Sequence, residues 1–211
     1  MTEIQQDVPE VVVARLPQYL RTLTQLIDQG MQVISSQQLG EQLQVTPAQI
    51  RKDLSYFGRF GKQGRGYSIA HLVDRLRHIL ALDHDWTVAV VGIGRLGRAI
   101  INYPGFGPEG FRVTCAFDAD PALVGQKAGG LTIHPLSQIR DVLEQKQVKI
   151  AIVAVPAANA QEVIDQLVMS GIKAILNYAP FAAQTPADVQ VRSIDPVLAL
   201  QSMTYYVQAP G

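Results

Sequence analysis

Hydrophobic positions follow two different periods along this chain, and the change comes near Leu82. Before it the spacing is helical and no strong β run occurs. From Trp86 onward, short apolar and β-branched runs alternate with helical stretches, an alternation that predicts an α/β fold with a parallel sheet and helices on both faces. The predicted strands are 87–91, 111–117, 131–133, 149–155 and 173–176, and the helices between them include 136–145 and 159–169.

This change divides the chain into three predicted parts. We expect a helix-rich domain at 1–82, an α/β domain at 83–193 joined to it through Asp83–Asp85, and a C-terminal helix at 194–211. Apolar residues fill nearly every position of 196–207, so we expect that helix to be buried on several sides. It either packs on its own chain or enters a partner chain, and the pattern alone leaves both open.

Composition narrows the class of protein. The 211 residues are 47% hydrophobic and 17% charged, with zero formal net charge, which is enough apolar material for real cores and gives no sign of disorder. The one cysteine, Cys115, excludes a disulfide framework and a cysteine-based zinc site, and its apolar surroundings favour a core position. The N-terminus has no signal-like pattern, and no apolar run approaches the ~18 residues of a membrane span. We therefore expect a soluble, cytoplasmic protein without a metal site.

A glycine-rich segment follows the first predicted strand. Gly92, Gly94 and Gly97 come after the apolar run 88–91 and before a helix-like run at 98–102, which is G-x-G-x-x-G in a strand–turn–helix context. In a dinucleotide site the first glycine permits a tight turn, the second lets a pyrophosphate approach the backbone, and the third lets the helix pack closely. The helix N-terminus then presents free N–H groups and a positive dipole end to the phosphates.

An acidic residue completes this pattern. Asp118 ends the next predicted strand, 21 residues beyond Gly97. A carboxylate there accepts hydrogen bonds from ribose hydroxyls and repels a 2′-phosphate, which favours NAD(H) over NADP(H). The alternative is a glycine-rich turn that binds nothing and an aspartate that is only a surface charge. The candidate cofactor-binding residues are Gly92, Ile93, Gly94, Arg95, Leu96, Gly97 and Asp118.

Two short helices joined by a tight turn are predicted in the first domain. The first covers 36–43 and the second 48–57, with Thr46 as the cap of the second helix and Pro47 in its first turn. This arrangement resembles a helix-turn-helix, whose second helix enters the major groove of DNA. The predicted buried face holds Ile50, Leu54 and Phe57. The outward residues, which are the candidates for DNA contact, are Gln49, Arg51, Lys52, Ser55 and Tyr56.

A basic, glycine-rich loop follows the second helix. Residues 58–67 contain four glycines and three cations, which is typical of a wing between two short strands. From 51 to 77, seven Lys or Arg residues stand against two acids, a local excess suited to a phosphate backbone. The alternative is an ordinary helical domain with a solvated basic face. The wing candidates for DNA contact are Arg59, Lys62 and Arg65, and the last, flanked by glycines, could enter a minor groove.

Five motifs occur together and in the order of one known family. They are R-K-D-L-S-Y-F-G at 51–58, G-x-x-G-x-G-Y at 61–67, G-x-G-R-L-G at 92–97, N-Y-P-G-F at 102–106 and N-Y-A-P at 177–180. On these motifs, and over essentially its whole length, the chain resembles the Rex family, the redox-sensing transcriptional repressors of bacteria. The resemblance implies a homodimer in which each chain combines a winged-helix domain, a Rossmann domain and a C-terminal helix swapped onto its partner.

The resemblance also implies a function and a switch. NADH favours a closed form that leaves DNA, while NAD⁺ permits binding to a palindromic operator. The coupling network of the family corresponds here to Arg21, Tyr103 and Asp195, and Tyr103 is also a cofactor-binding candidate. Some relatives carry an aromatic residue directly after this aspartate, close to the nicotinamide, whereas this chain has Pro196. Pro196 suits a helix start after an aspartate cap, which puts an aromatic contribution from this position in doubt.

Two other functions fit parts of the pattern. A small NAD-dependent oxidoreductase with a helical appendage is disfavoured, because only about 30 residues follow Tyr178, too few for a substrate domain. None of the four histidines has an evident carboxylate partner, and no catalytic residue is predicted. A CoA- or nucleotide-responsive regulator would share the fold, but Asp118 favours a free ribose diol and therefore NADH or NAD⁺ as the cofactor.

Overall fold

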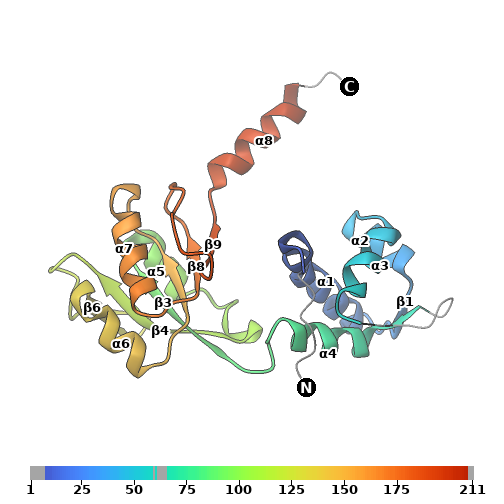
Figure 1. Cartoon of the computed structure of the whole chain (residues 1–211), viewed down its shortest axis with the longest axis horizontal. Helices are drawn as coiled ribbons and strands as arrows, with labels where there is room; N and C mark the ends of the chain where they lie inside the picture. The colour runs from blue at the N-terminus through green and yellow to red at the C-terminus, as the bar shows by residue number, and fades with distance from the viewer. Residues whose placement is uncertain (1–7, 59, 61–65, 209–211) are drawn as a thin grey trace. The chain divides into compact units, whose positions relative to one another are not determined.

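The computed structural model describes residues 8–58, 60 and 66–208, and the chain divides into two compact units, Met1–His84 and Asp85–Gly211 (Figure 1). Each unit has hydrophobic core residues of its own. The first unit is helical, and the second is built on a mostly parallel sheet.

The first unit packs its helices around one core. Its described elements are α1 (Glu10–Asp28), β1 (Val33–Ile34), α2 (Ser36–Leu43), α3 (Pro47–Ser55), β2 (Tyr67–Ser68) and α4 (Ile69–Ile79). Leu16 and Leu23 of α1, Ile50 of α3 and Leu76 of α4 are fully buried in the same cluster. Apolar residues recur on one face of each helix, and burying these faces against each other supplies the driving force for the unit to fold.

Both helices of this pair are capped at their N-termini. Ser35 accepts a hydrogen bond from the backbone N–H of Gln38, whose side chain in turn accepts one from the N–H of Ser35. Thr46 caps α3 by accepting from the backbone N–H of its third residue. A Cβ on Gly40 would lie 2.5 Å from the carbonyl oxygen of Val45, so the helix and the turn approach as closely as a glycine permits.

The second helix of this pair is shorter than predicted. It begins at Pro47 and ends at Ser55, not at residue 57. Tyr56 and Phe57 form a turn, and Phe57 is half-buried against the core. Phe57 therefore packs from the turn that follows the helix and not from the helix itself.

The loop predicted to be a wing is bounded by a described strand on one side. β2 follows the loop and pairs antiparallel with β1, which lies before α2 in the sequence. On the other side, residues 56–57 form a turn, and the described residues directly in front of the loop form no strand. Arg59, Lys62 and Arg65, the wing candidates for DNA contact, lie outside the residues that the structure describes.

The second unit is a Rossmann-like α/β domain. Across its described residues the sheet has seven strands in the order β5-β6-β4-β3-β7-β8-β9, and all neighbours are parallel except β5 and β6. The strands are β3 (Trp86–Val91), β4 (Phe111–Asp118), β5 (Lys127–Ala128), β6 (Leu131–Pro135), β7 (Ile150–Val153), β8 (Ala174–Asn177) and β9 (Gln190–Ser193). The helices are α5 (Arg95–Ile101), α6 (Ile139–Gln145), α7 (Ala157–Met169) and α8 (Pro196–Gln208), with 3-10 turns η1 (Gly107–Glu109) and η2 (Leu136–Gln138).

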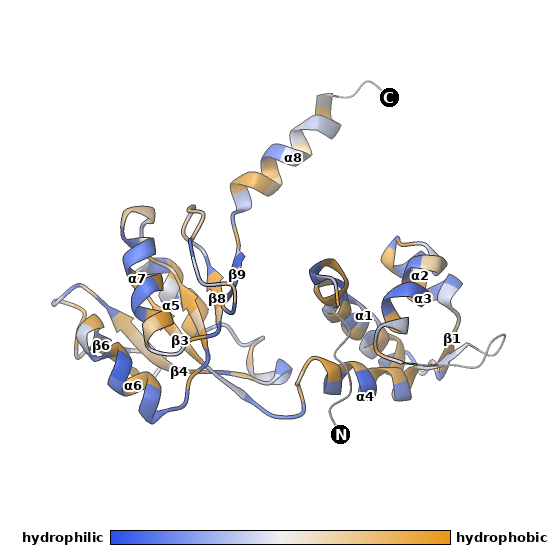
Figure 2. Cartoon of the chain, viewed as in Figure 1, coloured by the Kyte–Doolittle hydropathy of each residue, from blue (hydrophilic) through white to orange (hydrophobic). Residues whose placement is uncertain are grey.

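Helices cover both faces of this sheet, as predicted. On one face, Ile100 of α5 packs with Val90 of β3. On the other, Leu143 of α6 and Leu167 of α7 pack with Val91 of β3. Successive side chains of a strand point to opposite faces, so a strand covered on both sides must be apolar at every position. Figure 2 shows this as an orange band along the central strands.

The sheet is wider than predicted and is not wholly parallel. β5 and β9 stand at its two edges, in segments that carry no apolar run. β5 pairs antiparallel with β6, which makes the sheet mixed. The predicted strands in the centre of the sheet are all present.

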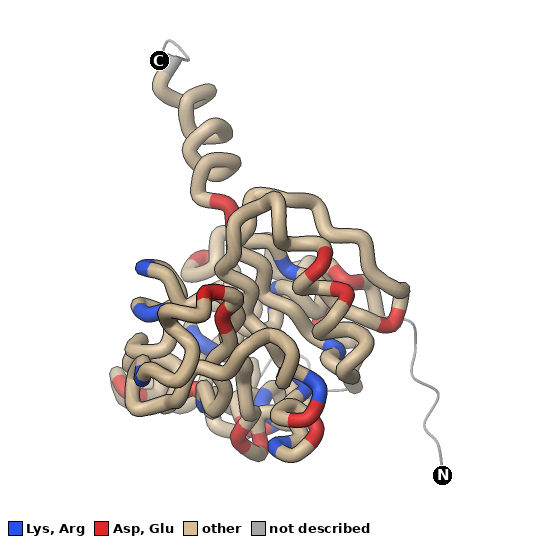
Figure 3. Tube along the Cα trace, turned by 90° about the vertical axis from the view of Figure 1, so that its left-hand side faces the viewer, with Lys and Arg blue, Asp and Glu red and all other residues tan. Residues whose placement is uncertain are grey.

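α8 is exposed along its described length. Every side chain of 196–207 is exposed, with Leu198 63% and Tyr206 77% accessible. The helix contains no Lys, Arg, Asp or Glu, and Figure 3 shows it without charge beyond the aspartate at its start. The expected burial of this helix is therefore not achieved within the single chain.

Two absences hold for the part of the chain that the structure describes. In these residues no helix has the length and apolar character needed to cross a membrane. Over the same range, no three His, Cys, Asp or Glu side chains lie close enough together to hold a metal ion. Cys115 is buried in the core, and this burial raises the pKa of its thiol.

Candidate functional sites

The glycine turn joins β3 to α5, and two of its glycines face backbone atoms. Gly92 has a φ of +93°, and a Cβ there would lie 2.6 Å from the carbonyl oxygen of Ala154. A Cβ on Gly97 would overlap the carbonyl oxygen of Gly92. Gly94 is exposed, with no heavy atom within 4 Å of its Cβ position. The fold itself requires glycine at 92 and 97, whereas at 94 only a molecule bound against the backbone would require it.

The other residues of the turn differ in what they can offer a ligand. The side chain of Ile93 is fully buried, so this residue can contribute only its backbone. Arg95 and Leu96 are exposed in the first turn of α5. The first N–H groups of a helix have no partner within it, and Gly94, at the cap, has no side chain to accept from them. This end of α5 therefore offers donors to an anionic group.

Asp118 lies directly beside the turn. Its Oδ2 accepts a hydrogen bond of 2.6 Å from the backbone N–H of Ile93, and its Oδ1 accepts one of 2.9 Å from the N–H of Asp120. Parallel pairing of β3 with β4 brings the two strand ends together across 25 residues of sequence. The carboxylate is thereby held in one orientation at the mouth of the glycine turn.

The loops after β3, β7 and β8 lie next to one another at the carboxyl ends of their strands. These neighbouring parallel strands all end there, and the N–H of Ala154 donates to the carbonyl oxygen of Val91 at 2.8 Å. Asn177 ends β8 and is fully buried. Its Nδ2 donates to the carbonyl oxygens of Ala179 and Phe181, and its Oδ1 accepts from the N–H of Ala179. In open α/β sheets, ligands bind outside the carboxyl ends of the strands. Asn177 orders the loop that follows β8 at this end of the sheet.

Tyr103 lies in the turn after α5 and is 58% exposed. Its ring packs edge-to-face on Phe106, with centroids 5.1 Å apart. A Cβ on Gly105 would lie 2.5 Å from the Tyr103 ring, so this ring rests on the glycine backbone. The N-Y-P-G-F segment is thus a compact turn that presents a tyrosine to solvent.

The predicted switch residues are distributed over both units. Arg21 is exposed on α1 of the first unit, whereas Tyr103 and Asp195 belong to the second. Asp195 is half-buried and accepts a hydrogen bond of 2.9 Å from the N–H of Val197, so it caps α8 with Pro196 as the first helical residue. A network that joins these residues would connect the two units, and it stays a prediction.

The candidate recognition helix α3 presents part of the predicted surface. Arg51, Lys52 and Ser55 are exposed, and Tyr56 is half-buried after the helix end. The Arg51 guanidinium donates to Ser36 Oγ at 2.9 Å, which ties it to the start of α2. Gln49 was predicted to face outward, but it is half-buried and its Nε2 donates to a neighbouring carboxylate. Its side chain reaches along the helix to that carboxylate, which lies one turn further along α3.

That carboxylate belongs to Asp53, which the sequence pattern presents only as one acid in a basic segment. Asp53 is completely buried and accepts from Arg15, Tyr19 and Gln49. Burial alone would raise the pKa of Asp53, but these hydrogen bonds outweigh it and lower that pKa. The bond to Asp53 raises the pKa of Arg15, and burial raises the pKa of Tyr19. The cluster at neutral pH is a carboxylate, a guanidinium and a neutral phenol.

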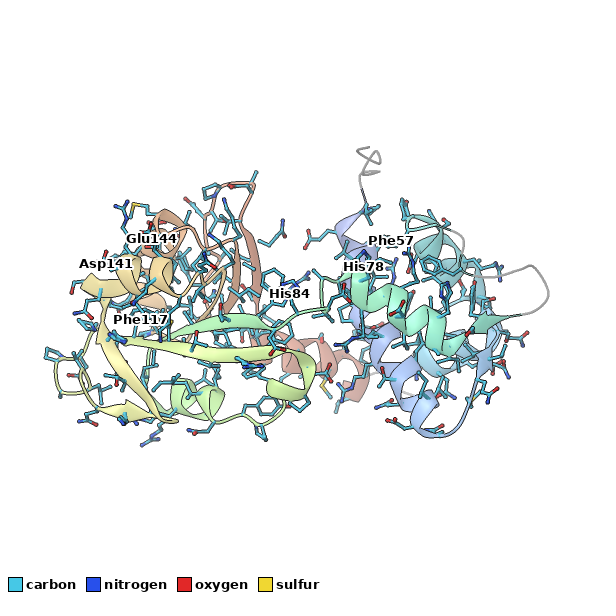
Figure 4. The ribbon with its side chains drawn as sticks, turned by 90° about the horizontal axis from the view of Figure 1, so that it is seen from below. Phe57, His78, His84, Phe117, Asp141 and Glu144 are labelled. Atoms are coloured by element: carbon cyan, nitrogen blue, oxygen red, sulfur yellow. The ribbon has the colours of Figure 1, made fainter. Side chains whose placement is uncertain are left out.

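One histidine differs from expectation. His78 Nδ1 lies 2.8 Å from Asp83 Oδ2, so this histidine does have a carboxylate partner. Both groups are exposed, with His78 in the last turn of α4 and Asp83 in the linker that carries His84 (Figure 4). The pair lies in the first unit and the glycine turn in the second, so it adds no evidence for a catalytic dyad at that turn.

Two protein-family models match the chain. One, described as "CoA binding domain", matches residues 83–181, and the other, described as "Putative DNA-binding protein N-terminus", matches residues 7–55. The first range includes the glycine turn and Asp118, and the second ends within the candidate recognition helix.

Relatives match over nearly the full length. A "Redox-sensing transcriptional repressor Rex" of Chloroflexus aurantiacus (strain ATCC 29366 / DSM 635 / J-10-fl) is 56% identical over 199 residues, 94% of each chain. A protein of the same description from Brevibacillus brevis is 46% identical over 202 residues, 96% of this chain and 98% of the relative.

Solved structures of one repressor match as well. The crystal structure of RSP, a Rex-family repressor, has a TM-score of 0.87 and 35% identity, covering 96% of this chain and 94% of that one. RSP in complex with beta-NAD⁺ and operator DNA gives a TM-score of 0.90 at 37% identity, covering 96% and 93%. RSP with beta-NADH gives 0.85 at 34% identity, covering 96% and 95%. With such identity across almost the entire length, this chain belongs to the Rex family of redox-sensing transcriptional repressors.

Proposed function

We propose that this chain binds operator DNA through α3 and the loop that follows it, and that NADH bound at the glycine turn releases it. The observation that carries the proposal is the hydrogen bond between Asp118 and the N–H of Ile93, which completes a dinucleotide-type turn in a chain whose first unit contains a helix-turn-helix. RSP, of the same family, has been crystallised with operator DNA and beta-NAD⁺, and with beta-NADH.

The geometry of the second unit suits an adenine dinucleotide. Gly94 leaves open backbone where a pyrophosphate can approach, beside the free N–H groups of α5. Asp118 is oriented to accept from ribose hydroxyls, and its charge would repel the 2′-phosphate of NADP(H). The backbone N–H of Ile93 donates to Asp118 and so helps to orient the carboxylate, while the side chain of Ile93 is buried in the core. The proposed ligands are therefore NADH and NAD⁺.

The first unit supplies the proposed DNA surface. Arg51, Lys52 and Ser55 are the exposed side chains of α3 that can reach a major groove, with Tyr56 beside them. Arg59, Lys62 and Arg65 of the loop would contact phosphates or a minor groove. The local excess of positive charge supplies the affinity that is independent of sequence.

We further propose a homodimer in which α8 packs on the partner chain. α8 is uncharged and exposed along its described length, and a helix of 13 residues without a partner is marginal in water. A dimer places two recognition helices about one DNA turn, or a multiple of it, apart, as a palindromic operator requires. Operator DNA of bacteria lies in the cytoplasm, which is where we place the dimer.

The proposed switch works through the two charge states of nicotinamide. The oxidised ring is cationic and the reduced ring is neutral, so charged groups near it can bind the two forms with different affinity. A ligand shifts a conformational equilibrium only when it binds the two states unequally. Arg21, Tyr103 and Asp195 are the proposed residues that connect the nicotinamide to the DNA-binding unit. Pro196, where some relatives carry an aromatic residue, removes ring stacking from this contact.

Family membership decides against the enzyme alternative, because Rex proteins are transcriptional repressors. The CoA-responsive alternative shares the fold of the second unit and is decided by calorimetry. We expect NADH and NAD⁺ to bind, NADPH to bind more weakly because of Asp118, and CoA not to bind. Failure of both nicotinamide dinucleotides to bind would overturn the assignment.

The decisive experiment is an operator titration across NADH/NAD⁺ ratios at fixed salt. The probe is the operator duplex crystallised with RSP, and binding is followed by fluorescence anisotropy. The salt concentration must be stated, because phosphate contacts make the affinity strongly salt-dependent. We expect affinity to fall as the NADH fraction rises. An affinity indifferent to this ratio would refute redox sensing.

A further inference from the structure

We propose that Asp53 is a positioning residue for operator recognition. Its buried carboxylate, held by Arg15 and Tyr19 of α1, sets the rotation of α3 about its own axis and so aims Arg51 and Lys52 at DNA. The inference rests on the proposed function of α3 as the recognition helix.

The carboxylate is fully engaged by described donors. Asp53 Oδ2 accepts from Arg15 Nε at 2.6 Å and from Tyr19 Oη at 2.6 Å. Asp53 Oδ1 accepts from Arg15 Nη2 at 2.7 Å and from Gln49 Nε2 at 2.6 Å. Two of these bonds form a planar, bidentate pair with one guanidinium, which fixes the angle between the groups as well as their distance.

Direction distinguishes this cluster from the apolar contacts of the same helix. Ile50 and Leu54 bury α3 in the core, but packing against apolar neighbours is non-directional. The four bonds to Asp53 are directional, and three come from two side chains one turn apart on α1. A rotation of α3 that the apolar face could accommodate would break them. Lys52 precedes Asp53 directly, so the rotation that these bonds fix also fixes where Lys52 points.

Stability alone gives little reason to keep a charged pair here. Replacing a buried ion pair by well-packed apolar side chains is often neutral or stabilising. The core of this unit contains apolar residues such as Leu16, Ile50 and Leu54. Apolar side chains at positions 15 and 53 could extend that core into the space that the ion pair now fills. A cluster that contributes orientation more than stability is the arrangement expected at a surface that must match DNA.

The cluster also resolves an electrostatic conflict. An exposed acid next to the recognition cations would weaken their attraction for phosphate. Asp53 faces inward and is paired with Arg15, whose side chain is 22% exposed, so its charge is neutralised inside the unit. Arg51 and Lys52, which precede it in the sequence, keep their charge in solvent. The motif R-K-D thus combines two outward cations with one inward anchor.

The test separates orientation from stability. Tyr19→Phe removes one bond to the carboxylate and keeps the ring, while the double variant Arg15→Met with Asp53→Leu replaces the cluster by apolar side chains. Leu76→Val in α4 is the matched control, because it weakens the same core and removes none of the four bonds to Asp53. Each full-length variant is titrated, over a series of salt concentrations, with the RSP operator duplex and with an unrelated duplex of equal length. NADH affinity and thermal unfolding are measured in parallel.

We expect both cluster variants to stay folded and to bind the operator roughly tenfold more weakly. The slope of log affinity against log salt concentration should become shallower by about one for each phosphate that the variant no longer neutralises. NADH affinity should be unchanged, and the control should keep its operator affinity despite its own loss of thermal stability. Folded cluster variants with wild-type operator affinity and salt slope would overturn the inference, as would an equal loss of affinity in the control. If the wild-type chain itself fails to bind the duplex, the proposed function falls, and this inference with it.

Discussion

At the residue scale, the glycine turn shows that one motif can contain glycines required for different reasons. Backbone atoms crowd the Cβ positions of Gly92 and Gly97, whereas the space around that of Gly94 is open. The first two glycines are therefore requirements of folding, and for the third we propose a requirement of binding. This distinction can be measured, because a methyl group at each position should affect a different property.

We expect Gly97→Ala to destabilise the second unit by about 1–3 kcal/mol or more, since its methyl group would overlap the carbonyl oxygen of Gly92. Gly94→Ala should change the unfolding free energy by less than about 1 kcal/mol but weaken NADH binding. Fluorescence of Trp86, the only tryptophan of the chain, reports unfolding of this unit, and calorimetry reports NADH affinity. Wild-type affinity in Gly94→Ala would contradict the assigned role.

Asp53 makes the unfolding free energy of the first unit depend on pH in the acidic range. Its pKa is lowered below the ordinary value of 3.8 in the folded chain, so the unfolded chain takes up a proton more readily. Its stabilising contribution is therefore complete above pH 3.8 and is lost as the pH falls through the lowered pKa. The stability difference between the wild type and Asp53→Asn should shrink over that acidic range. Urea unfolding followed by circular dichroism tests this.

The control for the acid profile is Asp74→Asn, which changes a carboxylate on α4 of the same unit that lies outside the Asp53 cluster. Comparing Asp53→Asn with Asp74→Asn at each pH separates the effect of the cluster from that of losing a carboxylate elsewhere in the unit. A difference between the wild type and Asp53→Asn that stays constant down to strongly acidic pH would contradict the proposed linkage.

Site residues that lie in a motif could be named from sequence, and residues that meet only in three dimensions could not. The glycine spacing and Asp118 were identified because a strand, a turn and a helix surround them in order. Asp53 was not identified as buried, because its partners Arg15 and Tyr19 lie 38 and 34 residues away. For the same reason Gln49 was predicted to point outward.

At the element scale, burial explains which strands the sequence revealed. β3 and β7 are covered on both faces and are apolar almost throughout, so they stand out as runs. β5 and β9 lie at sheet edges, where their mostly exposed residues leave no such pattern. Only hydrogen bonding to a neighbouring strand defines them, and this neighbour is not visible in local sequence. β1 was not predicted for the same reason, because its partner strand β2 lies far from it in the sequence.

The recognition role of α3 makes a prediction for a single exposed cation. Lys52→Ala should weaken binding to operator and unrelated duplexes by a similar factor, and reduce the salt slope by about one, because a phosphate contact carries no sequence information. Arg140→Ala, which removes an exposed cation from α6 in the other unit, is the control. An equal effect of both variants would mean that only total charge matters and that α3 has no specific role.

At the scale of the whole molecule, the proposed dimer depends on α8. If the proposal is right, deletion of 196–211 should leave a monomer that no longer binds the operator, measured by light scattering and anisotropy. Leu200→Asp introduces a charge into the exposed apolar helix and should also dissociate the dimer. Gln201→Ala, at the next position, should leave the dimer intact. A wild-type chain that is monomeric at micromolar concentration would contradict the assembly.

The exposed helix also connects repression to gene dosage. If α8 finds its partner surface on a second chain, dimers follow mass action, and at low expression their number grows with the square of the number of chains. Occupancy of the operator then rises more steeply than the copy number of the gene. In such a dimer, operator DNA that binds only the paired form would also shift free monomers towards the dimer.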